Sequence, residues 1–213
     1  MLLLVLPICN CARGLVAKWQ GDDSAECSGR ITLNPFVHLD PIGSLMILLV
    51  GLGWSKPMPI NPTRMKNYRK GILLTSLAGP VANLISAIVC NLIRALLLCS
   101  QGVLNSLSSD EITPIYCLMT ILSIISNINV CLAVIELLPI PPMDGFNILH
   151  YFAGNKFNRW YYMNQRTINI VSMVIVLLLF TLPSEINPLY YLISLVSNLI
   201  YHITSWIPVV RWS

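Results

Sequence analysis

The sequence predicts an all-α polytopic membrane protein with about five transmembrane helices, a re-entrant or interfacial segment and a short β element. Of its 213 residues, 55% are hydrophobic and 10% charged, and the mean hydropathy is +0.71. Soluble domains carry about 25% charged residues. Several apolar runs approach the roughly 20 residues that a helix needs to cross a bilayer. These runs are Met1–Ala17, Gly71–Cys99, Thr113–Leu138, Ile168–Leu182 and Pro188–Ile207.

The first run, Met1–Ala17, has the length and position of a signal peptide. No basic residue precedes its apolar core, however, and Arg13 lies inside the run. Signal peptides carry their positive charge before the apolar region, so we expect a retained helix here. Most of the seven cysteines lie in apolar runs, which favours packing as small hydrophobic side chains over a disulfide framework.

Charge placement predicts the orientation of the chain in the membrane. Two stretches, 56–70 and 154–166, contain basic but no acidic residues, namely Lys56, Arg64, Lys66, Arg69 and Lys70 in the first and Lys156, Arg159 and Arg166 in the second. Basic loops stay on the cytoplasmic side, and two spans between these loops return the chain to that side. We therefore expect both loops to be cytoplasmic. The modest net charge of +4 gives no reason to expect a nucleic-acid partner.

The most polar part of the chain is Lys18–Asp40. Gly29–Pro35 alternates in polarity and predicts a short edge strand at the cytoplasmic face. Asp40, which precedes a proline, is expected to cap Ile42–Leu52, a run too short to cross the bilayer and therefore expected to be re-entrant or interfacial. Three prolines within 57–62 predict an extended connection.

A single carboxylate follows the proline-rich end of another apolar run. Asn129–Gly145 contains Pro139, Pro141 and Pro142, and Asp144 comes directly after them. Proline stops a helix and stiffens the chain that follows, so Asp144 is held rigidly at the end of a hydrophobic segment. This makes it a candidate site residue. The alternative is a helix that ends in a proline turn, with Asp144 as the cap of the next element.

Four motifs extend this observation along the chain. In order, they are GRITLNPFVHLDPIGSL, GLGWSKPMPINP, LAGPVANL and LLPIPPMDG. Together they resemble the site-2 protease family of intramembrane zinc metalloproteases. The resemblance covers Cys9–Phe152 and implies a membrane core over residues 1–153, followed by a two-helix segment over 154–213. It also implies a zinc site below the bilayer surface, where transmembrane segments are cleaved. In that family H-E-x-x-H supplies two histidine ligands and a glutamate base, and the aspartate of the LDG motif completes the metal site.

The sequence departs from this pattern at the metal site itself. Cys9 stands at the first histidine position, Asn10 at the general-base position and Arg13 at the second histidine position. A cysteine thiolate can bind zinc, but an asparagine amide cannot take a proton from water and a guanidinium cannot ligate a metal. Glu136 also replaces an asparagine that, in the family, helps to hold the substrate backbone. We therefore expect no zinc and no catalytic residue.

The charged residues at these positions suggest what could replace the positive charge of a metal ion. An unpaired ion inside a membrane helix costs at least about 2.5 kcal/mol. Our hypothesis is that Arg13 pairs with Glu136, Asp144 or both, and so replaces the charge of the metal. The alternative is that Arg13 extends to the cytoplasmic surface near the end of its helix.

Two classes of function follow from the residues and the resemblance. The first is a catalytically inactive pseudoprotease that binds transmembrane segments or partner membrane proteins, with Cys9, Asn10, Arg13, Glu136 and Asp144 as its pseudo-active site. The second is an active zinc metalloendopeptidase with non-standard ligands, which are Cys9 and Asp144 with the possible addition of His38 or His150. We interpret His38 as a loop-fixing residue and His150 as a packed interfacial residue. A transporter or channel on the same scaffold is a third, more distant alternative.

Overall fold

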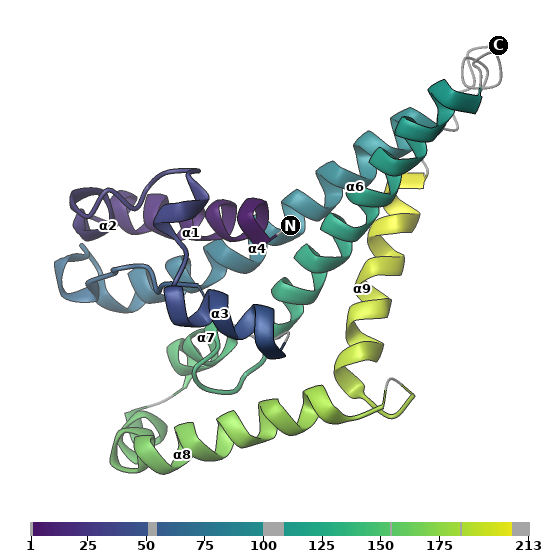
Figure 1. Cartoon of the computed structure of the whole chain (residues 1–213). Helices are drawn as coiled ribbons and strands as arrows, with labels where there is room; N and C mark the ends of the chain where they lie inside the picture. The colour runs from purple at the N-terminus through teal and green to yellow at the C-terminus, as the bar shows by residue number, and fades with distance from the viewer. Residues whose placement is uncertain (1, 51–54, 100–108, 154, 184, 206–213) are drawn as a thin grey trace. The chain divides into compact units, whose positions relative to one another are not determined.

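The computed structural model describes residues 2–50, 55–99, 109–153, 155–183 and 185–205 (Figure 1). These residues form helices joined by turns, and their β structure is limited to one isolated bridge between Leu39 and Ser55. The helices are α1 (Leu2–Trp19), α2 (Ser24–Cys27), α3 (Pro41–Val50), α4 (Tyr68–Cys99), α6 (Ser109–Glu136), α7 (Asp144–Phe152), α8 (Asn155–Thr181) and α9 (Pro188–Ser205), with 3-10 turns η1 (Pro35–Val37) and η2 (Pro62–Arg64). The prediction of a helical protein is confirmed for this part of the chain.

Three of the described helices are long and apolar enough to cross a membrane, which supports a membrane protein. The candidate spans are Tyr68–Leu98, Pro114–Glu136 and Arg159–Leu179. The expected count of five spans is not confirmed. The first and last predicted runs form α1 and α9, each 18 residues long and interrupted by polar side chains, and neither is among these candidates. Met1 and residues 206–207 of those runs lie outside the described residues.

Two expectations for connecting segments require correction. The predicted edge strand over Gly29–Pro35 is not confirmed, because the segment forms turns and bends. Its backbone N–H groups return to nearby residues: Gly29 donates to Glu26 O (2.8 Å) and Arg30 to Ala25 O (2.9 Å). The segment therefore closes α2 instead of pairing with a strand.

The second correction concerns the expected loop 154–166. Residues 155–166 form the first turns of α8, and residue 154 lies outside the described part of the chain. The helix thus begins before its apolar section, and polar residues such as Asn164 and Arg166 lie exposed on its surface.

The cap expected at Asp40 is confirmed. Its Oδ1 accepts a hydrogen bond from the backbone N–H of Gly43 (2.8 Å), which satisfies one of the free donors at the start of α3. The described part of the run that it caps forms α3, whose ten residues are too few to cross a bilayer, and residues 51–52 of the expected run lie outside the described residues.

The chain divides into two compact units. Unit 1 comprises Met1–Ala82 and Ile135–Thr181, and unit 2 comprises Asn83–Val134 and Leu182–Ser213. In unit 2, Ala87 of α4, Val130 of α6 and Ile200 of α9 form a small buried cluster. This division is one of packing, and the family-based boundary after residue 153 stays a prediction. All residues expected at the candidate site belong to unit 1.

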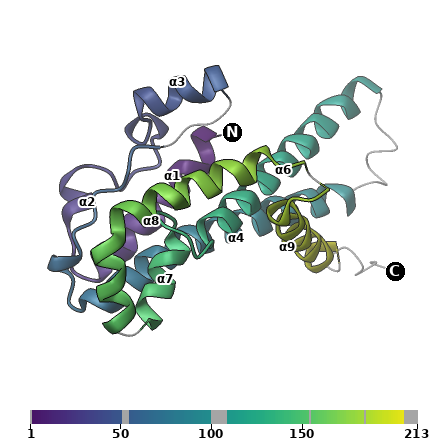
Figure 2. The same cartoon turned by 90° about the horizontal axis from the view of Figure 1, so that it is seen from below.

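The buried residue Asp22 links the end of α1 to the extended segment that precedes α4. This extended segment runs close to α2 (Figure 2). Its carboxylate accepts hydrogen bonds from the Ser24 N–H (3.0 Å), the Ser24 hydroxyl (2.5 Å) and the Asn61 N–H (2.6 Å). Burial raises the pKa of Asp22, but these bonds and the nearby Arg64 charge outweigh burial and hold the pKa below its usual range. The ionised carboxylate therefore stabilises this connection.

The Asp22 contact predicts a pH dependence of local stability. Because the pKa of the folded form lies below the unfolded value of about 3.9, the contribution is complete well above that value and is lost as pH falls through the folded pKa. We expect the hydrogen-exchange protection of the Asn61 amide to decline in acid. Asp22→Asn removes the titrating group, so the protection is lower by about 1–3 kcal/mol near neutral pH and no longer declines in this way.

Asp23 provides the matched control for this experiment. Its carboxylate makes an exposed ion pair with Arg64 (2.6 Å), and such pairs contribute about 0–1 kcal/mol. Asp23→Asn is therefore expected to leave the protection of Asn61 nearly unchanged. Equal loss of protection in both variants would contradict the role assigned to Asp22.

Candidate functional site

The candidate site is built on one face of α1, which runs beside the first half of α4 (Figure 1 and Figure 2). Cys9 and Arg13 are four residues apart and Asn10 and Arg13 three, so the three side chains share a face of the helix. Cys9 and Asn10 are each only 4% exposed. The Arg13 side chain is 22% exposed. The residues at the expected metal-site positions therefore point into unit 1.

Arg13 forms ion pairs with both expected carboxylates. Its Nη2 lies 2.8 Å from Oε1 of Glu136, at the end of α6, and 2.5 Å from Oδ2 of Asp144, at the start of α7. The carboxylate side chains are 19% and 17% exposed, so all three charges lie mostly inside the protein. The expected ion pairs are present. The Arg13 guanidinium therefore points toward these two carboxylates and does not extend to the surface, which was the alternative.

Neutral hydrogen-bond donors complete this charge cluster. One guanidinium faces two carboxylates, which leaves an excess of negative charge. The Cys9 thiol donates to Glu136 Oε1 (3.5 Å), and the side chains of Ser76 and Asn147 hydrogen-bond to Asp144. Cys9 thus serves as a donor here. Ser76 and Asn147 could not be predicted from the sequence, because a single serine or asparagine in an apolar helix does not reveal its partner.

Gly79 of α4 provides the space for the Arg13 guanidinium. A Cβ atom at this position would lie 2.7 Å from Nη2 and 2.9 Å from Cζ of Arg13, closer than real Cβ contacts allow. Small residues in a membrane helix permit the close approach of a neighbouring element. The structure shows that the group that approaches is a side-chain cation.

The proline-rich turn places the two carboxylates next to each other. Glu136 ends α6 and Asp144 begins α7, and the intervening residues fold back so closely that a Cβ on Gly145 would overlap the carbonyl oxygens of Leu137 and Leu138. Glycine is needed here because of this approach of backbone to backbone. The turn therefore brings the ends of two helices to one cation.

A cavity of about 510 Å³ opens beside the charge cluster. Asn10, Arg13 and Asp144 form one polar wall of this cavity. The remaining lining residues come from α4, from the segment before it and from α7: Ser55, Pro57, Met58, Ile60, Pro62, Ile72, Thr75, Ser76 and Asn147. The Asn10 Nδ2 atom is buried and has no hydrogen-bond partner among the described residues. An unsatisfied amide donor beside a cavity of this size can hold a carbonyl group of a bound molecule.

These residues do not fit the zinc ion that the resemblance implies. Within the described part of the chain, no three His, Cys, Asp or Glu side chains are arranged to hold a metal. The guanidinium of Arg13 lies between Glu136 and Asp144, where a metal bound by these carboxylates would need to sit. A catalytic zinc site uses three protein ligands and a water, and the cluster does not supply them.

The two histidines considered as further ligands lie in other surroundings. His38 is fully buried, and its Nε2 is 2.8 Å from Thr32 O, which agrees with a loop-fixing role. The His150 ring contacts Phe146, Tyr161 and Tyr162, at ring-centroid distances of 6.1, 6.0 and 5.7 Å. None of these contacts connects either histidine to Arg13.

Comparison with known proteins supports a protease-like relative. The chain is 38% identical over 138 residues to a protein of Bacillus subtilis (strain 168) named "Putative zinc metalloprotease YwhC". The aligned region covers 65% of this chain and 60% of that protein, so the chain spans well under two thirds of the relative's length. No family model and no solved structure matches the chain. The similarity supports a relationship to metalloproteases.

The close contact between Gly79 and the Arg13 guanidinium predicts that substitutions at these two positions have non-additive effects on stability. Gly79→Ala displaces the guanidinium from its two carboxylates, and we expect a fall in thermal stability of the purified protein. Arg13→Leu leaves two buried carboxylates without their cation, a change that costs about 3–5 kcal/mol at buried pairs. In the Arg13→Leu background, Gly79→Ala should cause no further loss of stability, because the group it displaces is gone.

The four proteins of this double-mutant cycle separate the cluster from general helix effects. Alanine has a higher helix propensity than glycine by about 1 kcal/mol, so Gly79→Ala should stabilise α4 slightly once Arg13 is absent. Additive losses in the double variant would contradict the assigned contact.

Proposed function

We propose that this chain is a catalytically inactive, site-2-protease-like membrane protein that binds transmembrane segments of partner proteins. The observation that carries the proposal is the ion pair of Arg13 with Asp144, two positions at which the resemblance expects metal ligands, together with the second ion pair of Arg13 with Glu136. The similarity to the protein named "Putative zinc metalloprotease YwhC" supports a common origin of this chain and metalloproteases. In the proposed orientation, the basic stretches 56–70 and 154–166 lie on the cytoplasmic side.

The side chains at the cluster offer no route to hydrolysis. Hydrolysis by a metalloprotease needs an activated water and a base that takes its proton. Asn10 stands at the base position and its amide cannot accept that proton. Arg13 remains protonated and occupies the carboxylates that could otherwise act. The same groups can still bind, since a buried cation and an amide donor both attract carbonyl oxygens.

The cavity supports binding of a locally unwound segment. Its volume of about 510 Å³ falls within the range of sites that hold sizeable ligands. Met58, Ile60 and Ile72 provide an apolar wall, and Asn10 provides the free donor. A helical span has no free carbonyl to offer, whereas a span opened at a glycine or proline presents carbonyls that Asn10 can bind.

The test is site-specific photo-crosslinking in membranes. A benzophenone amino acid at Met58, within the cavity wall, is expected to crosslink to a co-expressed single-span reporter that carries Gly-Pro in its span. The same probe at Phe36, which is 75% exposed on η1, is the matched control and should not crosslink. The reporter should stay full-length, and the purified protein should hold only substoichiometric zinc.

Two results would replace this proposal with an active metalloprotease. One is stoichiometric, tightly bound zinc in the purified protein. The other is cleavage of the reporter that is lost in Asp144→Ala. Equal crosslinking from Met58 and Phe36 would instead show that the cavity does not select the reporter.

A further inference from the structure

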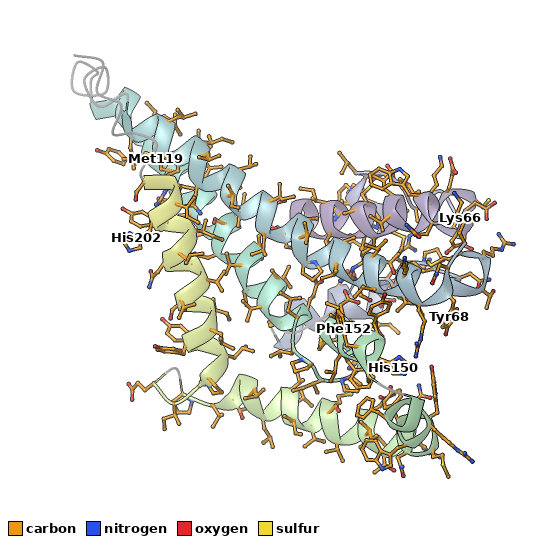
Figure 3. The ribbon with its side chains drawn as sticks, turned by 180° about the vertical axis from the view of Figure 1, so that it is seen from behind. Lys66, Tyr68, Met119, His150, Phe152 and His202 are labelled. Atoms are coloured by element: carbon orange, nitrogen blue, oxygen red, sulfur yellow. The ribbon has the colours of Figure 1, made fainter. Side chains whose placement is uncertain are left out.

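A second cavity lies in unit 1, between the start of α4, α7 and α8, and the function proposed above does not use it. It has a volume of about 150 Å³. Six side chains with hydrogen-bonding groups line it: Tyr68, Arg69, Asn147, His150, Tyr151 and Tyr162. Figure 3 shows Tyr68 and His150 close together at this end of the unit. We refer to it as the Arg69 cavity.

The groups around the Arg69 cavity favour an anion. A guanidinium, an imidazole, an amide and three phenols all donate hydrogen bonds, and no described residue that lines the cavity is acidic. The His150 Nε2 atom is buried and has no hydrogen-bond partner in the described part of the chain. A buried nitrogen of this kind lacks a partner that a bound oxygen would supply.

The charge of Arg69 reaches into this cavity. Burial and the Arg69 charge both lower the pKa of His150, so the imidazole stays neutral near neutral pH. A neutral imidazole can donate one hydrogen bond to an anion, while the guanidinium can donate two in parallel. The site thus combines one permanent positive charge with neutral donors.

The aromatic cluster around His150 holds this arrangement in place. The Phe146 ring lies 4.6 Å from the Tyr161 ring and joins α7 to α8, and the His150 ring stands edge-on to Tyr162 at 5.7 Å. These contacts fix the imidazole from two helices. The Arg69 cavity is therefore supported by packing that does not depend on a ligand.

The size and position of the cavity narrow the choice of anion. At about 30 Å³ for each water, 150 Å³ holds roughly five waters, which suits a phosphate group and excludes a peptide segment. Tyr68 and Arg69 begin the candidate span Tyr68–Leu98, and Tyr162 lies near the start of Arg159–Leu179. These span ends are at the level of lipid headgroups, where aromatic and basic side chains are enriched.

We propose that the Arg69 cavity binds a phosphate group, as carried by an anionic lipid headgroup or a soluble phosphate ester. Arg69 contacts two phosphate oxygens, and His150 and the tyrosine hydroxyls bind the remaining ones. Basic pockets between transmembrane helices are known to hold such headgroups. This site shares Asn147 with the surroundings of the Arg13 cluster, but the proposed partner binding does not require a phosphate group.

Native mass spectrometry of the purified full-length chain in detergent tests the proposal. The probes are phosphatidic acid, diacylglycerol as its phosphate-free counterpart, and glycerol 3-phosphate as a competitor. We expect phosphatidic acid to bind and diacylglycerol not to. Competition by glycerol 3-phosphate at comparable concentration would identify a soluble ester as the source of the phosphate, and its absence would identify the lipid.

Variants separate the cavity from the general basic surface. Arg69→Gln should weaken binding on the order of tenfold, as loss of a charge-assisted hydrogen bond predicts. Lys70→Gln makes the same charge change at an exposed neighbour that does not line the cavity, and should have less than about a twofold effect. Should Arg69→Gln fail to fold, Tyr162→Phe removes a hydroxyl without altering charge and should weaken binding by a smaller factor.

Three outcomes would overturn the proposal. These are equal losses in Arg69→Gln and Lys70→Gln, equal binding of phosphatidic acid and diacylglycerol, and unchanged binding in both Arg69→Gln and Tyr162→Phe. The first would assign the effect to diffuse surface charge, and the second to the acyl chains alone.

Discussion

The ion pairs of Arg13 are the constraint on which the rest of unit 1 depends. A guanidinium enclosed by two carboxylates joins three parts of the chain that are distant in sequence: α1, the end of α6 and the start of α7. Removing charges from water is costly, so such a cluster adds little net stability compared with apolar side chains of the same shape. Its effect is specificity, since any arrangement that separates one member leaves a charge unpaired. Two members of the cluster, Arg13 and Asp144, also line the cavity beside it.

Much of the fold could be predicted because long apolar runs have few alternatives. The runs that became α4 and α6 are longer than a bilayer requires, and their helical state follows from the need to satisfy backbone groups internally. Polar segments were harder. Alternation in Gly29–Pro35 resembled a strand, but its N–H groups bond to residues of α2. The basic stretch before residue 168 resembled a loop because apolar periodicity does not mark the polar start of a helix such as α8.

The charged members of the candidate site could be found from sequence because ions within apolar segments need partners. Arg13, Glu136 and Asp144 were the expected partners, and their distances agree with that expectation. The assignment of Arg13 and Asp144 to metal-ligand positions, and of Glu136 to a substrate-binding position, rests on the resemblance and remains a prediction. Ser76, Gly79 and Asn147 were not identified, since their roles arise from the register between α1, α4 and α7. Periodicity within one helix carries no information on that register.

The contact between Gly79 and Arg13 limits which substitutions can be accepted at these two positions during evolution. With a Cβ atom at position 79, the Arg13 guanidinium would have to move from its present place beside the two carboxylates, whereas a shorter side chain at position 13 imposes no such demand. Substitutions at these two positions are therefore coupled: glycine at 79 lets arginine at 13 keep both of its ion pairs, and the loss of that glycine would weaken them. Covariation of the two positions among related chains would separate those that carry an internal cation from those that keep room for a metal.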